Sequence, residues 1–269
     1  MPAPPSTGPS GVNGSSPEDD DQTPPSNPPA GTLEAKQVRT MFDGIAGVYD
    51  LLNSVMTAGL HHRWRERAAD LASLGPGDRV LDAATGTGDL AIELARRVAP
   101  GGEVVGSDFS ETMLDRAREK PKPTGAGLRF EWGDALDLPY ENGYFDAATV
   151  GFGARNFADL GRGLRELARV VRPGGRVVIL EITTPRKQPL SLFFGLWFER
   201  VVPALGRLSG NSDAYSYLPS SVRRFPEPAE LAAEMERAGL QEIHYLLTAG
   251  GIIAIHSGTV PPSPGQQQR

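Results

Sequence analysis

The chain has 269 residues and carries 27 lysines and arginines against 33 aspartates and glutamates, so its formal net charge is −6. A chain of this length can bury a sizeable core, but it lacks the positive charge that binding to a nucleic acid backbone requires. Cysteine is absent, which excludes disulfide bonds, thiolate metal sites and a cysteine nucleophile. The four histidines show no His-Glu-x-x-His spacing, so the sequence predicts no zinc site of that kind.

The two ends of the chain differ in composition from the middle. Residues 1–33 hold nine prolines and no aromatic residue, and they predict a disordered arm because they cannot bury enough apolar surface. This arm also lacks the charged start and apolar stretch of a signal peptide, so a cytoplasmic location is expected. Residues 258–269 are rich in proline, serine and glutamine and predict a second tail. The folded domain is therefore expected to span residues 34–257.

Strand-like and helix-like patterns alternate through the first part of this domain. Short apolar runs bounded by turn residues predict strands, and apolar residues at helical spacing predict helices. In chain order we expect a strand at 79–83, a helix over 90–98, a strand at 103–108, a helix at 111–119 capped by Ser110, strands at 127–132 and 144–150, a helix over 160–171 and a strand at 176–182.

The C-terminal part predicts a helix at 229–238 and then a hairpin formed by residues 243–247 and 252–256. Repeated strand–helix units are typical of a doubly wound, mostly parallel α/β sheet, here of seven strands and Rossmann-like, with the hairpin as an antiparallel edge. The sequence predicts no transmembrane helix, because polar residues interrupt the uncharged stretch after Glu242.

Residues 190–218 form an unusual segment between the last two predicted units. It concentrates Phe193, Phe194, Trp197 and Phe198 in a chain that is only 7% aromatic. One interpretation is a core helix. The other is an apolar cover over a hydrophobic substrate or a membrane surface.

A glycine-rich loop follows the first predicted strand. Gly86 and Gly88 let the backbone turn tightly and approach a ligand, because neither residue has a Cβ atom. Asp108 ends the next predicted strand, where its carboxylate could accept both hydroxyls of an adenosine ribose. The glycines and Ala91 also satisfy the dinucleotide fingerprint, so this loop leaves a nicotinamide cofactor open.

Three further aspartates favour S-adenosylmethionine. Asp89 opens the next helix, where it would repel a pyrophosphate, whereas Asp82 and Asp89 together suit the cationic sulfonium and ammonium groups. Asp134 follows the third strand and could accept the adenine amino group. The alternatives are an ordinary helix N-terminal acid for Asp89 and an Asx turn for Asp134.

The motifs around these residues resemble those of class I S-adenosylmethionine-dependent methyltransferases. They are Val80-Leu-Asp-Ala-Ala-Thr-Gly-Thr-Gly-Asp, Ser107-Asp, Gly133-Asp-Ala and Arg172-Pro-Gly-Gly. More narrowly, the chain resembles the ubiquinone/menaquinone C-methyltransferase family (UbiE/MenG type) over residues 39–256. The stretches that carry this narrower resemblance are Met41-Phe-Asp-Gly-Ile-Ala-Gly-Val-Tyr-Asp-Leu-Leu-Asn, Gly151-Phe-Gly-Ala-Arg-Asn and Asn211-Ser-Asp-Ala-Tyr-Ser-Tyr-Leu.

The resemblance implies a methyltransferase domain that moves a methyl group from S-adenosylmethionine to a ring carbon of a reduced polyprenyl quinone. It places the cofactor contacts on Thr87, Asp108, Asp134 and Ala135. Gly151 stands where the family usually has a serine, so only a backbone contact is expected there.

Tyr49, Arg155 and Asn156 are the candidate catalytic residues. Arg155 could stabilise a developing phenolate and Asn156 could orient the ring, while Tyr49 could form a wall or a hydrogen bond. Their alternatives are loop stabilisation for the first two and helix packing for Tyr49. His61 and His62 are expected to be a surface pair rather than bases.

Demethylmenaquinol is the favoured substrate. Alternatives are a ubiquinone precursor, another small molecule, a nicotinamide-dependent oxidation, or cofactor binding without turnover. Tyr217 is a weaker candidate for a quinone contact, and Asp50 and Asn53 are expected to brace the N-terminal helix. The aromatic segment suggests a peripheral membrane contact, a homodimer is left open, and no nucleic acid partner is expected.

Overall fold

The computed structural model describes residues 59–196 and 219–262, and every structural statement below concerns these two ranges. The predicted arm at 1–33 and the candidate Tyr49 lie outside them. The same is true of Asp50, Asn53 and residues 197–218, which include Tyr217.

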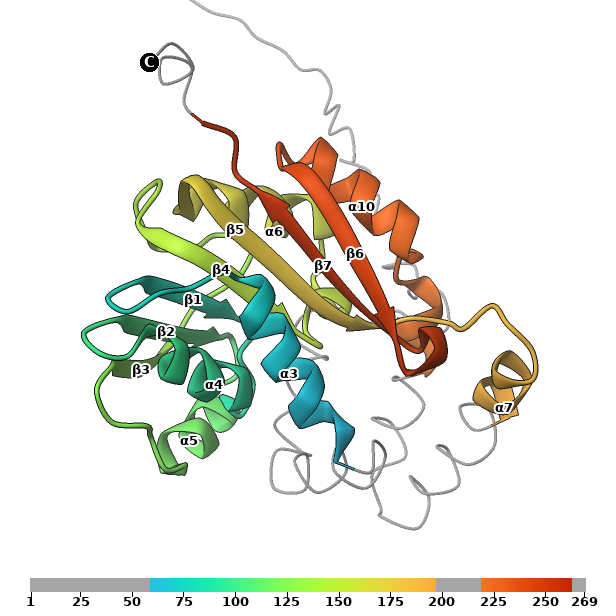
Figure 1. Ribbon diagram of the computed structural model, residues 1–269, viewed down its shortest axis with the longest axis horizontal. Helices are drawn as coiled ribbons and strands as arrows, with labels where there is room; N and C mark the ends of the chain where they lie inside the picture. The colour runs from blue at the N-terminus through green and yellow to red at the C-terminus, as the bar shows by residue number, and fades with distance from the viewer. Residues whose placement is uncertain (1–58, 197–218, 263–269) are drawn as a thin grey trace, which may run out of the picture.

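Seven strands form one sheet in the order β3-β2-β1-β4-β5-β7-β6 (Figure 1). The parallel strands are β1 (Arg79–Ala83), β2 (Glu103–Asp108), β3 (Gly127–Trp132), β4 (Phe145–Gly151) and β5 (Val171–Ile182). The hairpin consists of β6 (Gln241–Thr248), a turn η3 (Ala249–Gly251) and β7 (Ile253–Thr259). Strand β7 pairs antiparallel with both β5 and β6. The predicted doubly wound, mostly parallel α/β fold with an antiparallel edge is confirmed.

Helices cover both faces of this sheet (Figure 1). One face carries α3 (Leu60–Leu71), α4 (Asp89–Val98) and α5 (Glu111–Glu119), and the other carries α6 (Leu160–Val170) and α10 (Pro228–Arg237). The two faces bury separate apolar clusters, with Leu94 fully buried in the first and Leu164 in the second. Such burial stabilises a leucine by about 1.5–3 kcal/mol and is the main force that holds the layers together.

Side-chain caps fix where two of these helices begin. The Ser110 hydroxyl accepts a hydrogen bond from the Met113 amide at 3.3 Å, which confirms the predicted cap of α5. The Asp159 carboxylate does the same for α6, accepting from the Arg162 amide at 2.8 Å. Only two residues, Phe109 and Ser110, separate the end of β2 from the start of α5.

Strands β5 and β7 are longer than the sequence predicts. Strand β5 starts at Val171, so the Pro-Gly-Gly stretch after Arg172 belongs to it, although its register shifts opposite Phe145 and Ala147. A Cβ at Gly175 would stand 2.4 Å from the carbonyl oxygen of Asp146, so only glycine permits this approach. Strand β7 continues to Thr259, and the tail predicted from residue 258 therefore begins too early.

The strand order reverses between β1 and β4, which are neighbours in the sheet. The chain leaves β1 toward β2 and β3, whereas it leaves β4 toward β5. The loops after β1 and β4 therefore diverge and open a crevice at the carboxyl ends of the strands, the usual ligand site of such sheets. Among the helices in the described ranges, none is both long and apolar enough to span a bilayer.

Candidate functional site

A cavity of about 310 Å³ lies in this crevice. Its walls come from the ends of β1, β2 and β4, from the loop that leads into α4, and from the turn after β3. Seven of the eight predicted cofactor residues line it: Asp82, Gly86, Thr87, Asp108, Asp134, Ala135 and Gly151.

Asp108 is held rigidly at the end of β2 and is only 6% exposed. One carboxylate oxygen accepts a hydrogen bond from the Gly86 amide at 2.8 Å, and the other accepts from the Ser110 amide at 2.9 Å. These bonds connect the glycine-rich loop to the neighbouring strand. An ionised carboxylate has about four acceptor positions, and the Asp108 side chain lines the cavity.

Asp82 lies deeper, near the end of β1, and is fully buried. Its two oxygens accept hydrogen bonds from the hydroxyls of Thr85 and Thr149, each at 2.6 Å. Burial raises the pKa of Asp82 to about 6, and the two hydroxyls and the guanidinium of Arg65 offset only part of this effect. A cation in the cavity would stabilise the ionised form of Asp82.

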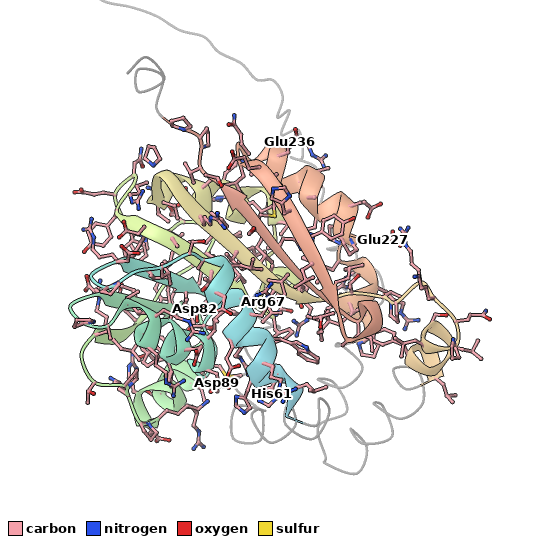
Figure 2. All side chains as sticks on the ribbon, viewed as in Figure 1. His61, Arg67, Asp82, Asp89, Glu227 and Glu236 are labelled. Atoms are coloured by element: carbon pink, nitrogen blue, oxygen red, sulfur yellow. The ribbon has the colours of Figure 1, made fainter. Side chains whose placement is uncertain are left out.

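Asp89 does not present the uncompensated charge that its position in the sequence predicts. Its carboxylate lies 2.5 Å from Nζ of Lys120 and 3.4 Å from Nη1 of Arg65. Burial acts to raise the pKa of Asp89, but these two cations outweigh it and hold the pKa below its usual value. The repulsion expected between Asp89 and a pyrophosphate is therefore largely neutralised. Figure 2 shows Asp82 and Asp89 beside α3, the helix that carries His61 and Arg67.

Asp134 forms the Asx turn that the sequence offered as an alternative, and it also lies at the cavity. Its carboxylate accepts a hydrogen bond from the Leu136 amide at 2.9 Å, which makes an Asx turn, and the residue also lines the cavity beside Ala135. Gly151 lines the wall at the end of β4, where a Cβ would lie 3.0 Å from Cδ2 of Leu90.

Gly88 is the predicted cofactor residue that is not part of the lining. It precedes α4 with φ of 81°, and a Cβ there would lie 2.6 Å from the ring of Phe130. Gly88 therefore allows the helix to pack closely on the sheet, whereas Gly86 supplies the amide that binds Asp108.

Of the candidate catalytic residues, Asn156 lines the cavity from the short helix η1 (Ala154–Asn156). The structure does not place Arg155 in the lining. Its side chain is 6% exposed and donates to the Glu181 carboxylate at 2.8 Å and to the Phe152 carbonyl oxygen. This contact matches loop stabilisation, the alternative considered for Arg155. Tyr49 lies outside the described residues.

Of the two histidines expected at the surface, only His62 is exposed. His62 is exposed, but His61 is 3% exposed and its ring centroid lies 4.0 Å from that of His62. The prediction of a surface pair is therefore wrong for His61, because the start of α3 turns this side chain inward.

Several lining residues have no motif that predicts them from the sequence. Phe109 directly follows a strand end, and this position is the only signal that could have identified it. Phe152 also follows a strand end and lies within the Gly151-Phe-Gly-Ala-Arg-Asn stretch, but it was not singled out there. Trp132 donates its indole N–H to the Phe109 carbonyl oxygen at 3.1 Å. The missed lining residues with large side chains are Arg65, Leu90, Phe109, Met113, Trp132, Leu136, Phe152 and Phe157.

Of the segment at residues 190–218, the structure describes only α7 (Leu190–Leu196), which follows β5 in the chain. Phe194 is 7% exposed and packs with Val222, in agreement with the core interpretation. Leu192 and Leu196 are 72% and 51% exposed, which agrees with an apolar cover.

Comparison with known proteins gives a consistent result. The sequence profile described as the ubiE/COQ5 methyltransferase family matches residues 31–260. A "Demethylmenaquinone methyltransferase" from Thermus thermophilus is 51% identical over 222 residues, which are 82% of this chain and 100% of that protein. A protein of the same name from Deinococcus radiodurans is 50% identical over 83% of this chain and 93% of its own length.

Solved structures support the fold alone, because their sequences are distant. A "SAM dependent methyltransferase" from Aquifex aeolicus aligns with a TM-score of 0.56 at 18% identity, covering 85% of this chain and 100% of that one. The "[4+2]-Cyclase SpnF" aligns with a TM-score of 0.61 at 19% identity, covering 86% of this chain and 97% of that one. Together with the profile match and the relatives above, these findings confirm the resemblance and show that the chain belongs to the ubiE/COQ5 methyltransferase family.

Proposed function

We propose that this enzyme transfers a methyl group from S-adenosylmethionine to a ring carbon of demethylmenaquinol. The observation that carries the proposal is the 51% identity to a demethylmenaquinone methyltransferase over that protein's whole length. A ubiquinone precursor is the second candidate. It is supported by a Geobacter sulfurreducens relative named "Ubiquinone/menaquinone biosynthesis C-methyltransferase UbiE", which is 39% identical over 84% of this chain.

The residues of the cavity fit the proposed cofactor. Asp108 and Asp134 line the cavity, and their carboxylates suit a ribose diol and the adenine amino group, respectively. Asp82 is a buried carboxylate without an ion pair in the described part of the chain, which suits a nearby cation. When bound, S-adenosylmethionine supplies an activated methyl group on a positively charged sulfur.

The chain itself then has to position and desolvate the acceptor ring. Phe152 and Phe157 give the cavity apolar walls beside Asn156, whose amide can orient a ring hydroxyl. Placement of this kind can contribute up to about 7–11 kcal/mol in ideal cases. Arg155 acts one step away, because its guanidinium binds the carbonyl oxygen of Phe152 and so fixes the wall.

The substrate assignment is tested by incubating the full-length enzyme with methyl-labelled S-adenosylmethionine and each reduced quinone, followed by mass analysis. We expect one labelled methyl group on demethylmenaquinol. Label on the ubiquinone precursor alone would transfer the assignment to the second candidate, and label on neither quinone would refute the proposal.

A matched pair of variants connects this activity to the cavity. Asp108→Asn replaces one acceptor oxygen by a donor, so we expect binding of the cofactor to weaken about 10-fold or more. Asp115→Asn makes the same change on the exposed face of α5, where the carboxylate is 66% exposed, and should leave binding unchanged.

We also propose that α7 helps to cover the polyprenyl tail and contacts the membrane surface. The exposed Leu192 and Leu196 support this role. Replacing both by serine should raise KM for a long-tailed quinol but leave a tail-less analogue unaffected. An equal effect on both substrates, or no effect on either, would refute it.

A further inference from the structure

Arg65 is a cation in a cavity whose other charged lining residues, within the described ranges, are all aspartates. It projects from α3, a helix on which the sequence shows no cofactor motif. Its side chain is only 9% exposed, so the guanidinium is held away from bulk water. The proposed function described above gives this residue no role.

The hydrogen bonds of the guanidinium are incomplete. Lys120 lies 2.5 Å from one oxygen of Asp89, whereas Arg65 Nη1 lies 3.4 Å from the other oxygen. Among the residues that the structure describes, the buried Nη1 atom of Arg65 has no hydrogen-bond acceptor. Leaving a buried charged donor without an acceptor is costly, so this atom favours a ligand that can accept its hydrogen bond.

The local charges indicate which ligand. Arg65 is the one cation that lines the cavity in the described ranges, and its guanidinium lies 3.4 Å from the Asp89 carboxylate. Asp82 and Asp108 lie on the adjoining strand ends and are negative when ionised. An α-amino acid group matches this pattern, because its carboxylate and its ammonium are both bonded to the same carbon and therefore lie close together. The planar guanidinium of arginine is also the side chain best suited to a carboxylate.

We propose that Arg65 binds the α-carboxylate of the amino acid portion of S-adenosylmethionine. This inference rests on the proposed function, because it assumes that the cavity holds this cofactor. Its competitor is a purely structural role, in which Arg65 braces Asp89 and lies over the ring of Phe152, 5.8 Å from its centroid.

Calorimetric binding of two neutral-sulfur ligands separates these roles. One is S-adenosylhomocysteine, and the other is its decarboxylated analogue, which differs only in lacking the carboxylate. An acidic cavity without a carboxylate contact would bind the analogue more tightly, because its net charge is more positive. With the Arg65 contact, the wild type should bind S-adenosylhomocysteine about 10- to 100-fold more tightly than the analogue.

Variants then assign the preference to the residue. Arg65→Met should lose the preference for S-adenosylhomocysteine without any loss of affinity for the analogue. Arg65→Lys should retain part of it, because the charge remains and the forked geometry is lost. Arg67→Met is the matched control on the exposed side of the same helix and should behave as the wild type (Figure 2).

The outcomes are distinct. Equal losses for both ligands in Arg65→Met would support the structural role and overturn the inference. A wild type without preference for the carboxylate would also overturn it, even if Arg65→Met does not fold. A wild type that binds neither ligand would refute the cofactor assignment as well, whereas normal binding without methylation of a quinol would leave the inference supported and refute the proposed substrate.

Discussion

Two buried carboxylates occupy equivalent places in the sheet, each at the next-to-last residue of its strand. Glu181 on β5 accepts hydrogen bonds from the Arg155 guanidinium at 2.8 Å, the Arg155 amide at 3.2 Å and the Ile182 amide at 2.9 Å. Asp82 on β1 accepts only from the hydroxyls of Thr85 and Thr149 in the described part of the chain.

The difference in partners corresponds to a difference in role. Glu181 is neutralised by a cation of the chain itself, and the pair closes the wall behind Phe152. Asp82 lines the cavity, and its pKa is raised to about 6 because burial is not compensated by a full ion pair. Proteins tolerate such unfavourable burial mainly at binding and catalytic sites. The paired carboxylate supports the structure, and the unpaired one is available for a cationic ligand.

The largest effect on stability is expected from breaking the buried ion pair of Arg155 and Glu181. Glu181→Ala leaves the Arg155 guanidinium buried without its carboxylate, so the free energy of unfolding should fall by about 3–5 kcal/mol. Urea denaturation measures this loss. The double variant Arg155→Met/Glu181→Leu should recover most of it, because an apolar pair needs no compensation.

An exposed pair provides the control for this result. Arg237 and Glu234 lie 2.9 Å apart on α10, with side chains 66% and 33% exposed. Glu234→Ala should cost less than about 1 kcal/mol. If Glu181→Ala lowers the free energy of unfolding no more than Glu234→Ala does, the ion pair of Glu181 does not stabilise the fold.

Replacing Asp82, the carboxylate without an ion pair in the described ranges, is expected to raise the free energy of unfolding rather than lower it. With its pKa raised from 3.8 to about 6, ionised Asp82 destabilises the folded protein by about 3 kcal/mol above pH 6. This cost is absent below pH 4, so it lowers wild-type stability as the pH rises from 4 to 6. Asp82→Asn should remove that decline and unfold at higher urea concentration at pH 8, while binding S-adenosylmethionine more weakly. A variant less stable than the wild type at pH 8 would contradict this assignment.

Binding should show a pH dependence from the same residue. Only ionised Asp82 attracts a cation, so affinity for S-adenosylmethionine should rise about 10-fold between pH 5 and pH 7 and then level off, given a pKa of about 6. Calorimetry at each pH measures this. The charged groups around Asp82 are Arg65, which lowers its pKa, and Asp108, which raises it. A profile of the same shape in Asp82→Asn would assign the titration to another group.

Much of the fold could be predicted because local signals and tertiary structure agree. The strands at β1, β2 and β3 and the helix α5 have the bounds that their apolar runs and the Ser110 cap indicate. Strand β5 differs because its Pro-Gly-Gly start breaks the usual strand pattern. The start of this strand stays in the sheet through contacts that are distant in sequence, which include the close approach of Gly175 to Asp146 and the hydrogen bonds of Gly174 and Gly175 with Val260.

The site could be predicted only where residues follow strand ends. Asp82, Asp108 and Asp134 could be predicted in this way, because parallel strands place their carboxyl ends together. The ion-pair partners of the charged residues could not be predicted from the sequence. Lys120 and Arg65 come from helix positions without a motif, yet they neutralise Asp89, and Glu181 removes Arg155 from the cavity lining.

The smallest expected effect concerns the hydroxyls that hold Asp82. Thr149→Val keeps the shape of the side chain but removes the donor at 2.6 Å, which acts to lower the pKa of Asp82. Loss of one such bond should raise that pKa by about one unit, and the pH midpoint of cofactor binding should move upward by the same amount. Thr248→Val, on the edge strand β6, is the control and should leave the midpoint unchanged. An unshifted midpoint in Thr149→Val would mean that the hydroxyls do not control when Asp82 is charged. A shifted midpoint would mean that the hydroxyls that bind Asp82 set the pH above which the cavity binds a cation. Glu181 has no such dependence on hydroxyl donors, because the Arg155 guanidinium pairs with it directly.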